Sequence, residues 1–356
     1  MSIRTPGPSQ GRLAGLAAAV TFGASAPFTA ALTGHGSPLF VAGLLYAGAA
    51  AVLVPVAISR LVRGVARLPH RSNVWALATL TLLGGIVGPI LLVSGLERLS
   101  SSVASLLLNL EAVTTALLGV TVYREHLGRR GWWSLALVVL GGAVLVGAPQ
   151  GSVDVLGVAA IAAACACWGL DNNLSRRLSL DDVVVVSGVK AAGAAVPMLA
   201  LAVLTGRTGG SPHVAGLLAV GAVGYGVSIG LDLIALRHLG AAREAVIFAT
   251  APFVGAVVAL GLGEPLGWTG AAAGGLMAAG ILVLLCEEHQ HQHRHEPMEH
   301  EHWHTHDDHH RHEHPPGLTV VEGGRGRHRH RHVHAELVHA HPHLPDAHHR
   351  HAHRDR

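Results

Sequence analysis

Ten apolar segments, each near the roughly 20 residues that an α-helix needs to cross a bilayer, fill the first 286 residues. Backbone polar groups in lipid must be paired within the protein, so segments of this kind form helices. The sequence therefore predicts an all-α integral membrane fold of ten transmembrane helices. The predicted segments run approximately over residues 13–32, 38–59, 74–95, 101–122, 132–148, 155–173, 183–204, 214–235, 242–262 and 268–286.

The composition agrees with this prediction. Charged residues make up 13% of the chain and hydrophobic residues 50%, and the mean hydropathy is +0.43. The 45 glycines also fit, because small residues let membrane helices approach closely. We find no cluster of nucleophilic residues, no cofactor fingerprint and no basic nucleic-acid surface. The sequence thus predicts that the protein is not an enzyme and has no nucleic-acid partner.

The arginines predict how the chain is oriented. With residues 1–12 in the cytoplasm, only Arg98 and Arg207 lie in outer loops, and the inner loops are arginine-rich. This is the expected positive-inside bias. An even number of helices then places the C-terminus in the cytoplasm as well, in a multi-pass protein of the plasma (inner) membrane. The inner-loop arginines are Arg60, Arg63, Arg67, Arg71, Arg124, Arg129, Arg130, Arg176, Arg177, Arg237 and Arg243.

The apolar part of the chain repeats itself. The sequence Glu125-His-Leu-Gly in the first half matches Glu264-Pro-Leu-Gly in the second, and Phe22-Gly23 matches Trp168-Gly169. Each half, 13–148 and 155–286, contains five predicted helices. An odd number per repeat gives the halves opposite orientations in the membrane, as in many secondary transporters.

Two stretches carry a resemblance to a known family. Leu110-Glu-Ala-Val-Thr-Thr-Ala-Leu-Leu-Gly-Val-Thr-Val-Tyr-Arg-Glu125 and Ala249-Thr-Ala-Pro-Phe-Val-Gly-Ala-Val-Val-Ala-Leu-Gly-Leu-Gly-Glu264 resemble the fourth helix of each repeat in EamA-type carriers of the drug/metabolite transporter (DMT) superfamily. The resemblance covers about residues 11–286. It implies ten helices and export of metabolites, amino acids or drugs by proton or solute exchange. The family's helix proline is present as Pro252 but missing from the first half, and the tail has no counterpart.

Ionisable groups inside a bilayer are costly, so the few within the predicted helices are candidates for substrate binding or ion coupling. Lys190, the only lysine, lies within the seventh segment. We interpret it as a contact for an anionic substrate or as a counter-ion, with snorkelling to the membrane surface as the alternative. Glu111 lies near the middle of the fourth segment, where it could carry a coupled proton or make a structural hydrogen bond, for example with Asn109.

Further candidates are weaker. Asp171, Asn172 and Asp232 lie near the cytoplasmic boundary, where polar groups cost less, and Tyr225 could face a substrate. Glu125 and Glu264 end equivalent helices, which favours a role at helix ends over a gate. Glycine clusters occur in the third and eighth segments and predict close packing or bending. They comprise Gly84, Gly85, Gly88, Gly221, Gly224, Gly226 and Gly230.

The tail, residues 287–356, has a different composition. It holds all but five of the 28 histidines. Because it lacks apolar periodicity, we expect it to be disordered and cytoplasmic. Closely spaced imidazoles could bind Zn, Ni, Co or Cu without a fixed site, and no cofactor is required. The candidate ligands are His289, His291, His293, His295, His300, His302, His304, His306, His328, His330, His332 and His334.

The sequence leaves several functions open. The leading hypothesis is a secondary transporter in the lipid bilayer that exports a small-molecule substrate and has a metal-binding regulatory or buffering tail. A second is efflux of a transition-metal ion or its chelate, although the predicted helices contain no cluster of histidine or acidic residues. A third is a membrane-anchored metal-storage protein, for which ten helices are more than an anchor needs. A homodimer is compatible with each.

Overall fold

The structure is a computed structural model that divides into two compact units, residues 1–287 and 288–356. The first unit, the membrane body, contains helices throughout its described part, and the second contains short strands. The described residues are 8–123, 127–147, 154–175, 178, 181–239 and 241–285 in the first unit, and 292–295, 298–304, 321–323, 327–334 and 337–340 in the second.

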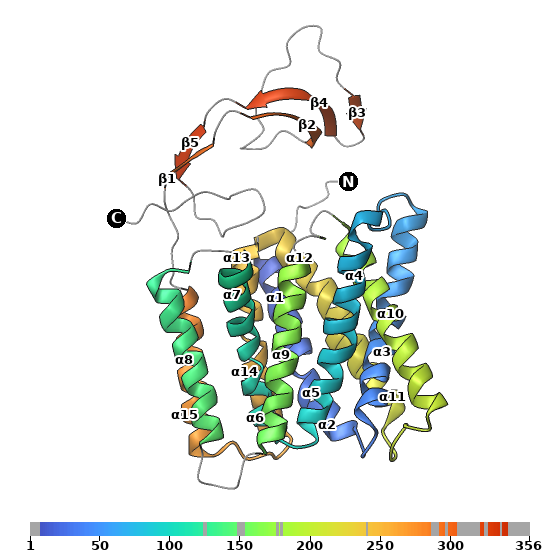
Figure 1. Cartoon of the computed structure of the whole chain (residues 1–356), viewed down its shortest axis with the longest axis vertical. Helices are drawn as coiled ribbons and strands as arrows, with labels where there is room; N and C mark the ends of the chain where they lie inside the picture. Colours follow the sequence, from blue (N-terminus) through green and yellow to red (C-terminus); the bar gives the residue numbers. More distant parts are fainter. Residues whose placement is uncertain are drawn as a thin grey trace. The chain divides into compact units, whose positions relative to one another are not determined.

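The first half of the body folds into a series of antiparallel helices (Figure 1). Several membrane segments consist of two or more shorter helices in succession. The elements are α1 (Pro8–Gly23), α2 (Ser25–Leu32), α3 (Pro38–Val62), η1 (Arg71–Asn73), α4 (Val74–Leu80), the π-helix η2 (Thr81–Val87), α5 (Gly88–Leu96), α6 (Ser101–Leu107), α7 (Leu110–Tyr123) and α8 (Arg129–Val146).

The second half follows a similar order, with the single helix α9 in place of α1 and α2 and, among the described residues, no counterpart of η1 before α11. Within the described residues, nine helical stretches of the body are long and apolar enough to cross a membrane, and Gly267–Val283 is a shorter apolar one. The predicted all-α membrane fold is therefore confirmed. The elements are α9 (Val155–Ser175), α10 (Val183–Leu204), α11 (Val214–Val220), the π-helix η4 (Gly221–Val227), α12 (Ser228–Leu239), α13 (Ala241–Phe248), α14 (Ala251–Gly261) and α15 (Gly267–Leu285).

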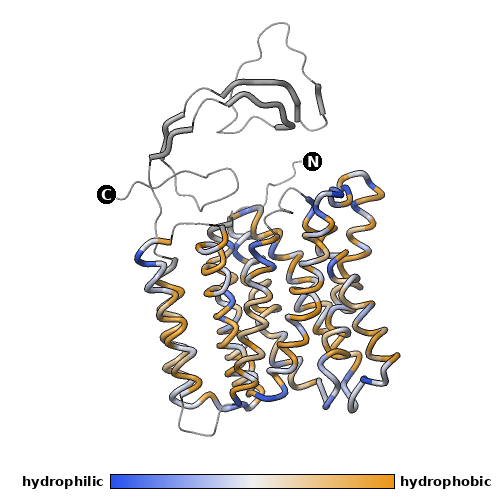
Figure 2. Tube along the Cα trace, in the orientation of Figure 1, coloured by the Kyte–Doolittle hydropathy of each residue, from blue (hydrophilic) through white to orange (hydrophobic). Residues whose placement is uncertain are grey.

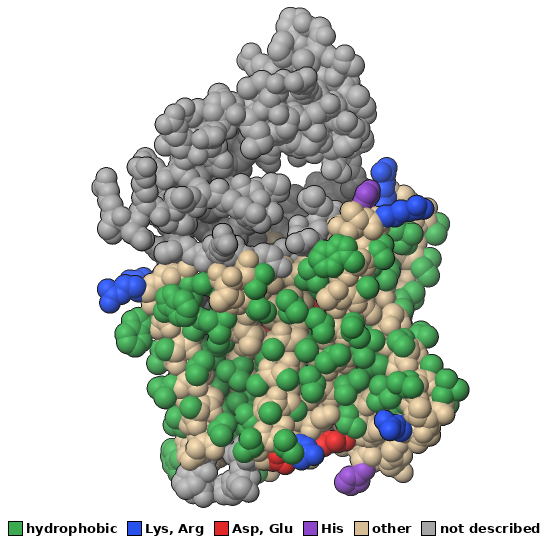
Figure 3. Space-filling model, in the orientation of Figure 1, with side chains coloured by type: hydrophobic (Ala, Val, Ile, Leu, Met, Phe, Trp, Pro, Cys, Tyr) green, Lys and Arg blue, Asp and Glu red, His purple; other side chains and the backbone are tan. Residues whose placement is uncertain are grey.

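The surface of the body is that of a membrane protein. The helices are apolar along their length and polar at their ends (Figure 2). On the face in view, hydrophobic side chains cover the middle, and charged side chains gather at the two ends (Figure 3). Large apolar side chains such as Leu204 and Trp268 are 85% and 91% exposed. Such exposure is favourable in lipid, where apolar surface needs no burial.

The helix contacts follow a two-fold pattern. The equivalent helices α3 and α10 pack against each other, as do α8 and α15. The contact of α1 with α12 has its counterpart in the contact of α9 with α5, and that of α1 with α14 in that of α9 with α7. The first helix of each repeat thus packs against helices of the other repeat, as expected for inverted repeats.

The fourth helix of each repeat is broken, which the sequence did not predict. The breaks lie at Leu108-Asn109, between α6 and α7, and at Ala249-Thr250, between α13 and α14. Asn109 Nδ2 donates to the Leu106 carbonyl at 2.8 Å, and Thr250 Oγ1 donates to the Ile247 carbonyl at 2.6 Å. Each polar side chain therefore binds a carbonyl three residues back and competes with the helical ladder.

The third helix of each repeat contains a π-helix, η2 or η4, at the predicted glycine clusters. A Cβ added to Gly221 would lie 1.9 Å from the Leu45 carbonyl oxygen, and one added to Gly48 would lie 2.1 Å from the Leu218 oxygen. Only glycine allows α3 to approach α11 and η4 this closely. Gly221 therefore allows the close packing that was predicted for its cluster, and the π-helices change the helix geometry at both clusters.

The described tail residues belong to the second unit. They form five short strands: β1 (Gln292–His295), β2 (Met298–His304), β3 (Val321–Gly323), β4 (Arg327–His334) and β5 (Leu337–Ala340). β1 pairs with β5, and a second antiparallel sheet has the order β2-β4-β3.

Candidate functional site

An ion pair lies between two membrane helices at the centre of the candidate site. Lys190 Nζ on α10 lies 2.6 Å from Asp171 Oδ2 on α9, and the side chains are only 20% and 11% exposed. The lysine therefore has a carboxylate partner on the neighbouring helix α9. Opposite charges in a low-dielectric environment attract strongly, which offsets part of the cost of removing both from water.

A second polar group lies beside this pair. Asn172 Nδ2 donates to Glu111 Oε1 on α7 at 2.8 Å and to Thr115 Oγ1 at 3.3 Å. The charges of Asp171 and Lys190 act on the Glu111 carboxyl. The structure thus brings together four residues that the sequence nominated separately, one from the first repeat and three from the second. Thr115 was not predicted, because a neutral hydroxyl in a helix carries no signal of cost.

The helices that carry these groups approach closely at a glycine. A Cβ added to Gly169 of α9 would lie 2.5 Å from Thr114 Oγ1 of α7. Thr114 Oγ1 donates to the Cys165 carbonyl at 2.8 Å, and Asn173 Nδ2 donates to the Thr115 carbonyl at 2.9 Å. These bonds fix the rotation of α9 so that Asp171 and Asn172 reach α10 and α7.

The π-helix η2 forms another wall of the site. Tyr46 Oη and Trp168 Nε1 both donate to the Gly84 carbonyl, at 2.9 and 3.1 Å. A Cβ at Gly84 would lie 2.5 Å from Asp171 Oδ1, which is buried without a hydrogen-bond partner among the described residues. Sequence reasoning missed Tyr46. Trp168 was visible only through its match to Phe22 in the internal repeat.

Three predicted residues make other contacts. Asn109 stabilises the break between α6 and α7, with Nδ2 also 3.8 Å from the sulfur of Met277. Tyr225 packs in η4 against Phe22 and Tyr46, each with ring centroids 5.8 Å away. Asp232 on α12 interacts with the carboxyl of Glu244 on α13, which the sequence analysis did not single out.

The residues predicted at helix ends have structural contacts. Glu264 accepts a hydrogen bond from Ser101 Oγ at 2.7 Å and one from the Ser102 amide at 3.3 Å, at the beginning of α6. A carboxylate there binds free amide groups and interacts favourably with the helix dipole. Pro252 lies in the first turn of α14, where its missing N–H costs nothing. Glu125 lies outside the described residues.

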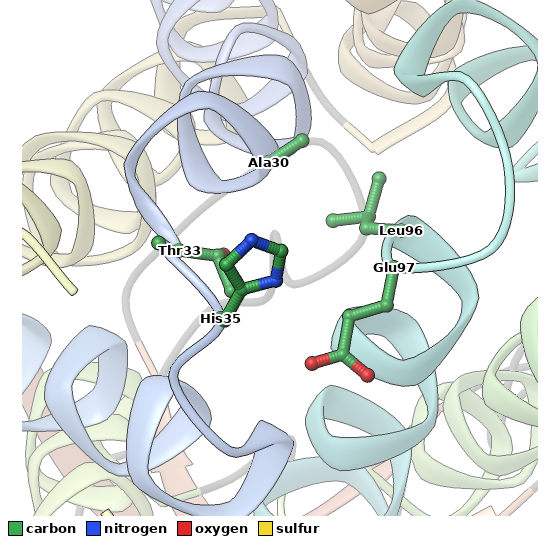
Figure 4. Close-up of a pocket in the computed structure, with 6 residues that line it drawn as sticks. Ala30, Thr33, His35, Leu96 and Glu97 are labelled. Atoms are coloured by element: carbon green, nitrogen blue, oxygen red, sulfur yellow. The ribbon is translucent and has the colours of Figure 1, made fainter. Parts of the chain in front are cut away.

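A cavity of about 580 Å³ opens at the end of the body that is predicted to face outward (Figure 4). His35 and Glu97 line it from different segments, with Ala30, Thr33 and Leu96. Burial raises the pKa of Glu97, and the nearby Arg98 and His35 oppose this effect. His35 has a φ of 61°, which is uncommon for a residue other than glycine. The sequence analysis named neither residue as a candidate.

The predicted metal ligands lie in the second unit. His289, His291 and His306 fall outside the described residues, and the other nine occupy positions in β1, β2 and β4. The part of the chain that the structure describes contains no group of three or more metal-ligating side chains placed to hold an ion. Metal binding by the tail thus stays a prediction.

Comparison with known proteins agrees with the fold. The chain is 30% identical over 237 residues to an uncharacterized transporter of Methanothermobacter thermautotrophicus, covering 64% of this chain and 69% of that protein. A protein of known crystal structure matches with a TM-score of 0.56 and 21% identity, over 77% of this chain and 95% of that one, which shows the fold alone. The model of the EamA-like transporter family matches residues 9–147 and 155–286. The chain belongs to the EamA-like transporter family, a family of multi-pass membrane transporters.

Proposed function

We propose that the protein is a secondary carrier that exports a small polar organic solute by alternating access. The observation that carries this proposal is the convergence of Lys190, Asp171, Asn172 and Glu111 inside the membrane body. These residues come from both repeats, and inverted-repeat carriers bind their substrates between the repeats. A metabolite, an amino acid or a drug with both acidic and basic groups fits this set of charges.

The proposed binding step is an exchange of partners. Lys190 offers a cation to an acidic group of the solute, and the unpaired Asp171 Oδ1 offers an acceptor to a donor group. A solute that takes these positions replaces the contact between α9 and α10 with contacts to itself. Because that contact joins two helices, its opening gives the two helices freedom to separate. Glu111 supplies the proton-coupling group in this scheme.

The energetic argument favours a function over a structural role. Buried ion pairs add little stability, and replacing them with well-packed apolar residues is often neutral or stabilising. A charge in the middle of a membrane helix costs at least about 2.5 kcal/mol. A scaffold alone would not need Lys190, whose counterpart in the first repeat is Leu45. Binding of a charged solute during transport would explain why a lysine is present at this position.

Transport assays with paired variants test the proposal. Proteoliposomes containing the wild type are first screened with amino acids, other metabolites and drugs to find a transported solute. Lys190→Gln, Asp171→Asn and the double variant should then lower its flux at least about 10-fold, because the removed contacts are worth over about 1.4 kcal/mol. The double variant leaves no buried unpaired charge, so its loss of flux cannot come from misfolding around one.

A matched control breaks another ion pair. Arg98 Nη1 lies 3.0 Å from Asp154 Oδ2 in an exposed position, with side chains 46% and 37% exposed. Arg98→Gln should leave the flux unchanged, because exposed pairs contribute little. Wild-type flux in the double variant would overturn the proposed site, whatever the control shows.

We further propose that both termini are cytoplasmic, in the plasma membrane, and that the tail binds transition-metal ions to regulate the carrier or to buffer metal. The arginine distribution supports the orientation, and the histidine content supports metal binding. A fluorescent protein that becomes fluorescent only in the cytoplasm should therefore fluoresce when it is fused after Arg356. Loss of fluorescence with full insertion would contradict the orientation.

A further inference from the structure

The first part of the chain carries positive charges without any acidic residue. No aspartate or glutamate occurs before Glu97, whereas the α3–α4 loop, residues 63–73, contains Arg63, Arg67 and Arg71. The side chains of these arginines are exposed, and none of them forms an ion pair with another described residue. The loop therefore presents uncompensated positive charges at one end of the body (Figure 1).

The second repeat places two carboxylates beside this loop, and both have other partners. Asp182 accepts a hydrogen bond from Arg60 Nε at 3.1 Å, and Asp181 Oδ2 accepts one from Asn73 Nδ2 at 3.0 Å. These bonds tie both ends of the loop to the residues that precede α10. The Val65 amide also donates to the Arg60 carbonyl at 3.0 Å. The loop is thus held in place by groups other than its three exposed arginines.

Apolar side chains are exposed between and beside these arginines. Val62, Val65 and Leu68 are 81%, 60% and 66% exposed, and Trp75 at the beginning of α4 is 51% exposed. Contact with water is unfavourable for such groups, but they suit the boundary between headgroups and acyl chains, where tryptophan is enriched. Because α3 and α4 belong to segments able to cross a membrane, the short loop between them lies at the bilayer surface.

We propose that the α3–α4 loop is a binding surface for anionic phospholipids. Arg63, Arg67 and Arg71 bind the headgroup phosphates, and the exposed apolar side chains pack against the beginning of the acyl chains. A guanidinium group matches the oxygens of a phosphate in a bidentate geometry, and basic clusters beside a membrane helix attract anionic lipid. This inference does not depend on the transported solute, and the proposed orientation decides only in which leaflet the lipid lies.

The mixture of charged and apolar groups favours a lipid over a soluble anion. A free phosphate ion or an acidic metabolite would bind the guanidinium groups but gain nothing from Val62, Val65 and Leu68. A phospholipid offers a phosphate and an acyl chain side by side, so it complements both kinds of group. Attraction by the charges and burial of the apolar surface then add together.

The test measures the lipid composition at the loop itself. Val62→Cys is labelled with a fluorophore in the full-length protein, which also carries Cys167→Ser and Cys286→Ser. Cys165 is buried and stays. The labelled protein is reconstituted in bilayers of phosphatidylcholine and phosphatidylglycerol, with brominated chains on one lipid or the other. Bromine quenches the fluorophore on contact, so the ratio of the two quenching curves gives the local preference for phosphatidylglycerol.

Two variants of equal net charge separate the loop from the charge of the whole protein. The clustered variant changes the three loop arginines to glutamine. The scattered variant removes exposed arginines from other parts of the body and keeps the loop intact. Thermal unfolding checks that both variants fold. The scattered substitutions are Arg12→Gln, Arg129→Gln and Arg207→Gln.

We expect the intact loop to prefer phosphatidylglycerol by at least about 5-fold, because each arginine near an anionic surface adds attraction. The clustered variant should lose this preference, and the scattered variant should keep it. Equal quenching by both lipids at the intact loop, or an equal loss in both variants, would overturn the proposal. Inorganic phosphate in excess over the lipid should leave the preference unchanged. If phosphate abolishes it, the loop binds a soluble anion and the lipid surface is wrong.

Discussion

Glu111 is the titratable residue that the first repeat contributes to the candidate site. Its carboxyl accepts a hydrogen bond from Asn172 on α9, so its protonation state affects the contact between α7 and α9. A protonated carboxyl keeps one acceptor oxygen and gains a donor, and an ionised one has acceptors only. Proton uptake at Glu111 therefore changes what α9 can bind, which is what coupling requires.

Glu111→Gln tests this coupling. Glutamine keeps an oxygen that accepts the Asn172 hydrogen bond but cannot titrate. We expect the variant to insert and fold normally and to lose the pH dependence of transport, measured as solute flux in proteoliposomes at several pH values. Glu97→Gln at the outer cavity is the control and should keep it. A pH profile in Glu111→Gln identical to that of the wild type would exclude Glu111 as the proton site.

Asp182 gives a prediction about stability. This residue precedes α10, accepts hydrogen bonds from the Val184 and Val185 amides, and forms an ion pair with Arg60, whose Nε lies 3.1 Å from Oδ2. Burial alone would raise the pKa of Asp182, but the Arg60 and backbone hydrogen bonds outweigh it and hold the pKa below its usual value.

A lowered pKa means that the folded state favours the ionised form. The stabilisation is complete above the unfolded-state pKa of about 3.9 and disappears as the pH falls through the lower folded-state value. Asp182→Asn should therefore lower stability by about 1 kcal/mol at neutral pH, a modest effect for a partly exposed pair. Thermal unfolding in detergent across pH should show the difference shrink as the pH falls below the unfolded-state pKa and vanish below the folded-state pKa. A difference that persists unchanged in acid would contradict the ionic origin.

Among the helices, the two π-helices are connected through one side chain. Tyr46 on α3 donates its hydroxyl to Gly84 of η2, and its ring lies 5.8 Å from that of Tyr225 in η4. The wider π-helical turn alters backbone pairing, and the Gly84 carbonyl binds two side-chain donors. A conformational change in either π-helix would therefore alter the contacts of Tyr46, which lies close to the Asp171–Lys190 pair.

Gly84→Ala tests the close approach of η2 to the site. The new methyl group would lie 2.5 Å from Asp171 Oδ1, so the π-helix or α9 must move. We expect a loss of about 1–3 kcal/mol of stability, typical of overpacking, together with loss of transport, measured by thermal unfolding and by flux.

Gly275→Ala is the matched control. Gly275 lies in α15, and a Cβ there would meet no atom within 4 Å. Alanine favours helix over glycine by about 1 kcal/mol, so this variant should be neutral or stabilised and active. If Gly84→Ala behaves like the control, the close approach at Gly84 has no importance for the carrier.

The helix arrangement of the membrane body is two-fold, but the charged residues of the candidate site are not repeated. The helix pairs and the helix breaks occur in both repeats, whereas Lys190 and Glu111 have Leu45 and Thr250 at their counterparts. The proposed alternating access needs two similar arrangements of the scaffold, but one charged site is sufficient for the proposed binding of a solute.

The proposed role of the tail in metal handling can be tested in whole cells. Cells expressing the full chain, a truncation after Glu288, or no protein should be compared for zinc, nickel and cobalt content under metal load. A buffering tail should raise cell-associated metal, and truncation should abolish the rise. A fall in metal that depends on the tail would favour metal efflux instead. No change with either chain would leave the tail without a metal role in the cell.

The sequence by itself determined the membrane segments and nominated residues of the site. Long apolar segments and charges within them are readable one residue at a time, because lipid makes each exposed polar group costly. That is why Lys190, Asp171, Asn172 and Glu111 could be named beforehand. Tyr46, Trp168 and Thr115 could not, because polar side chains without charge carry little cost and occur in many helices.

Only the tertiary structure decided which of these groups meet. Asp171 meets Lys190 of α10, and Asn172 meets Glu111 where Gly169 lets α9 approach α7 closely. Asp232 interacts instead with Glu244 on α13, and Tyr225 packs against Phe22 and Tyr46. The helix breaks depend on side chains that bind nearby carbonyls, and the tail register depends on which strands pair. The physical reason is common to all: helix and strand periodicity is a local property, whereas contacts depend on how the elements pack.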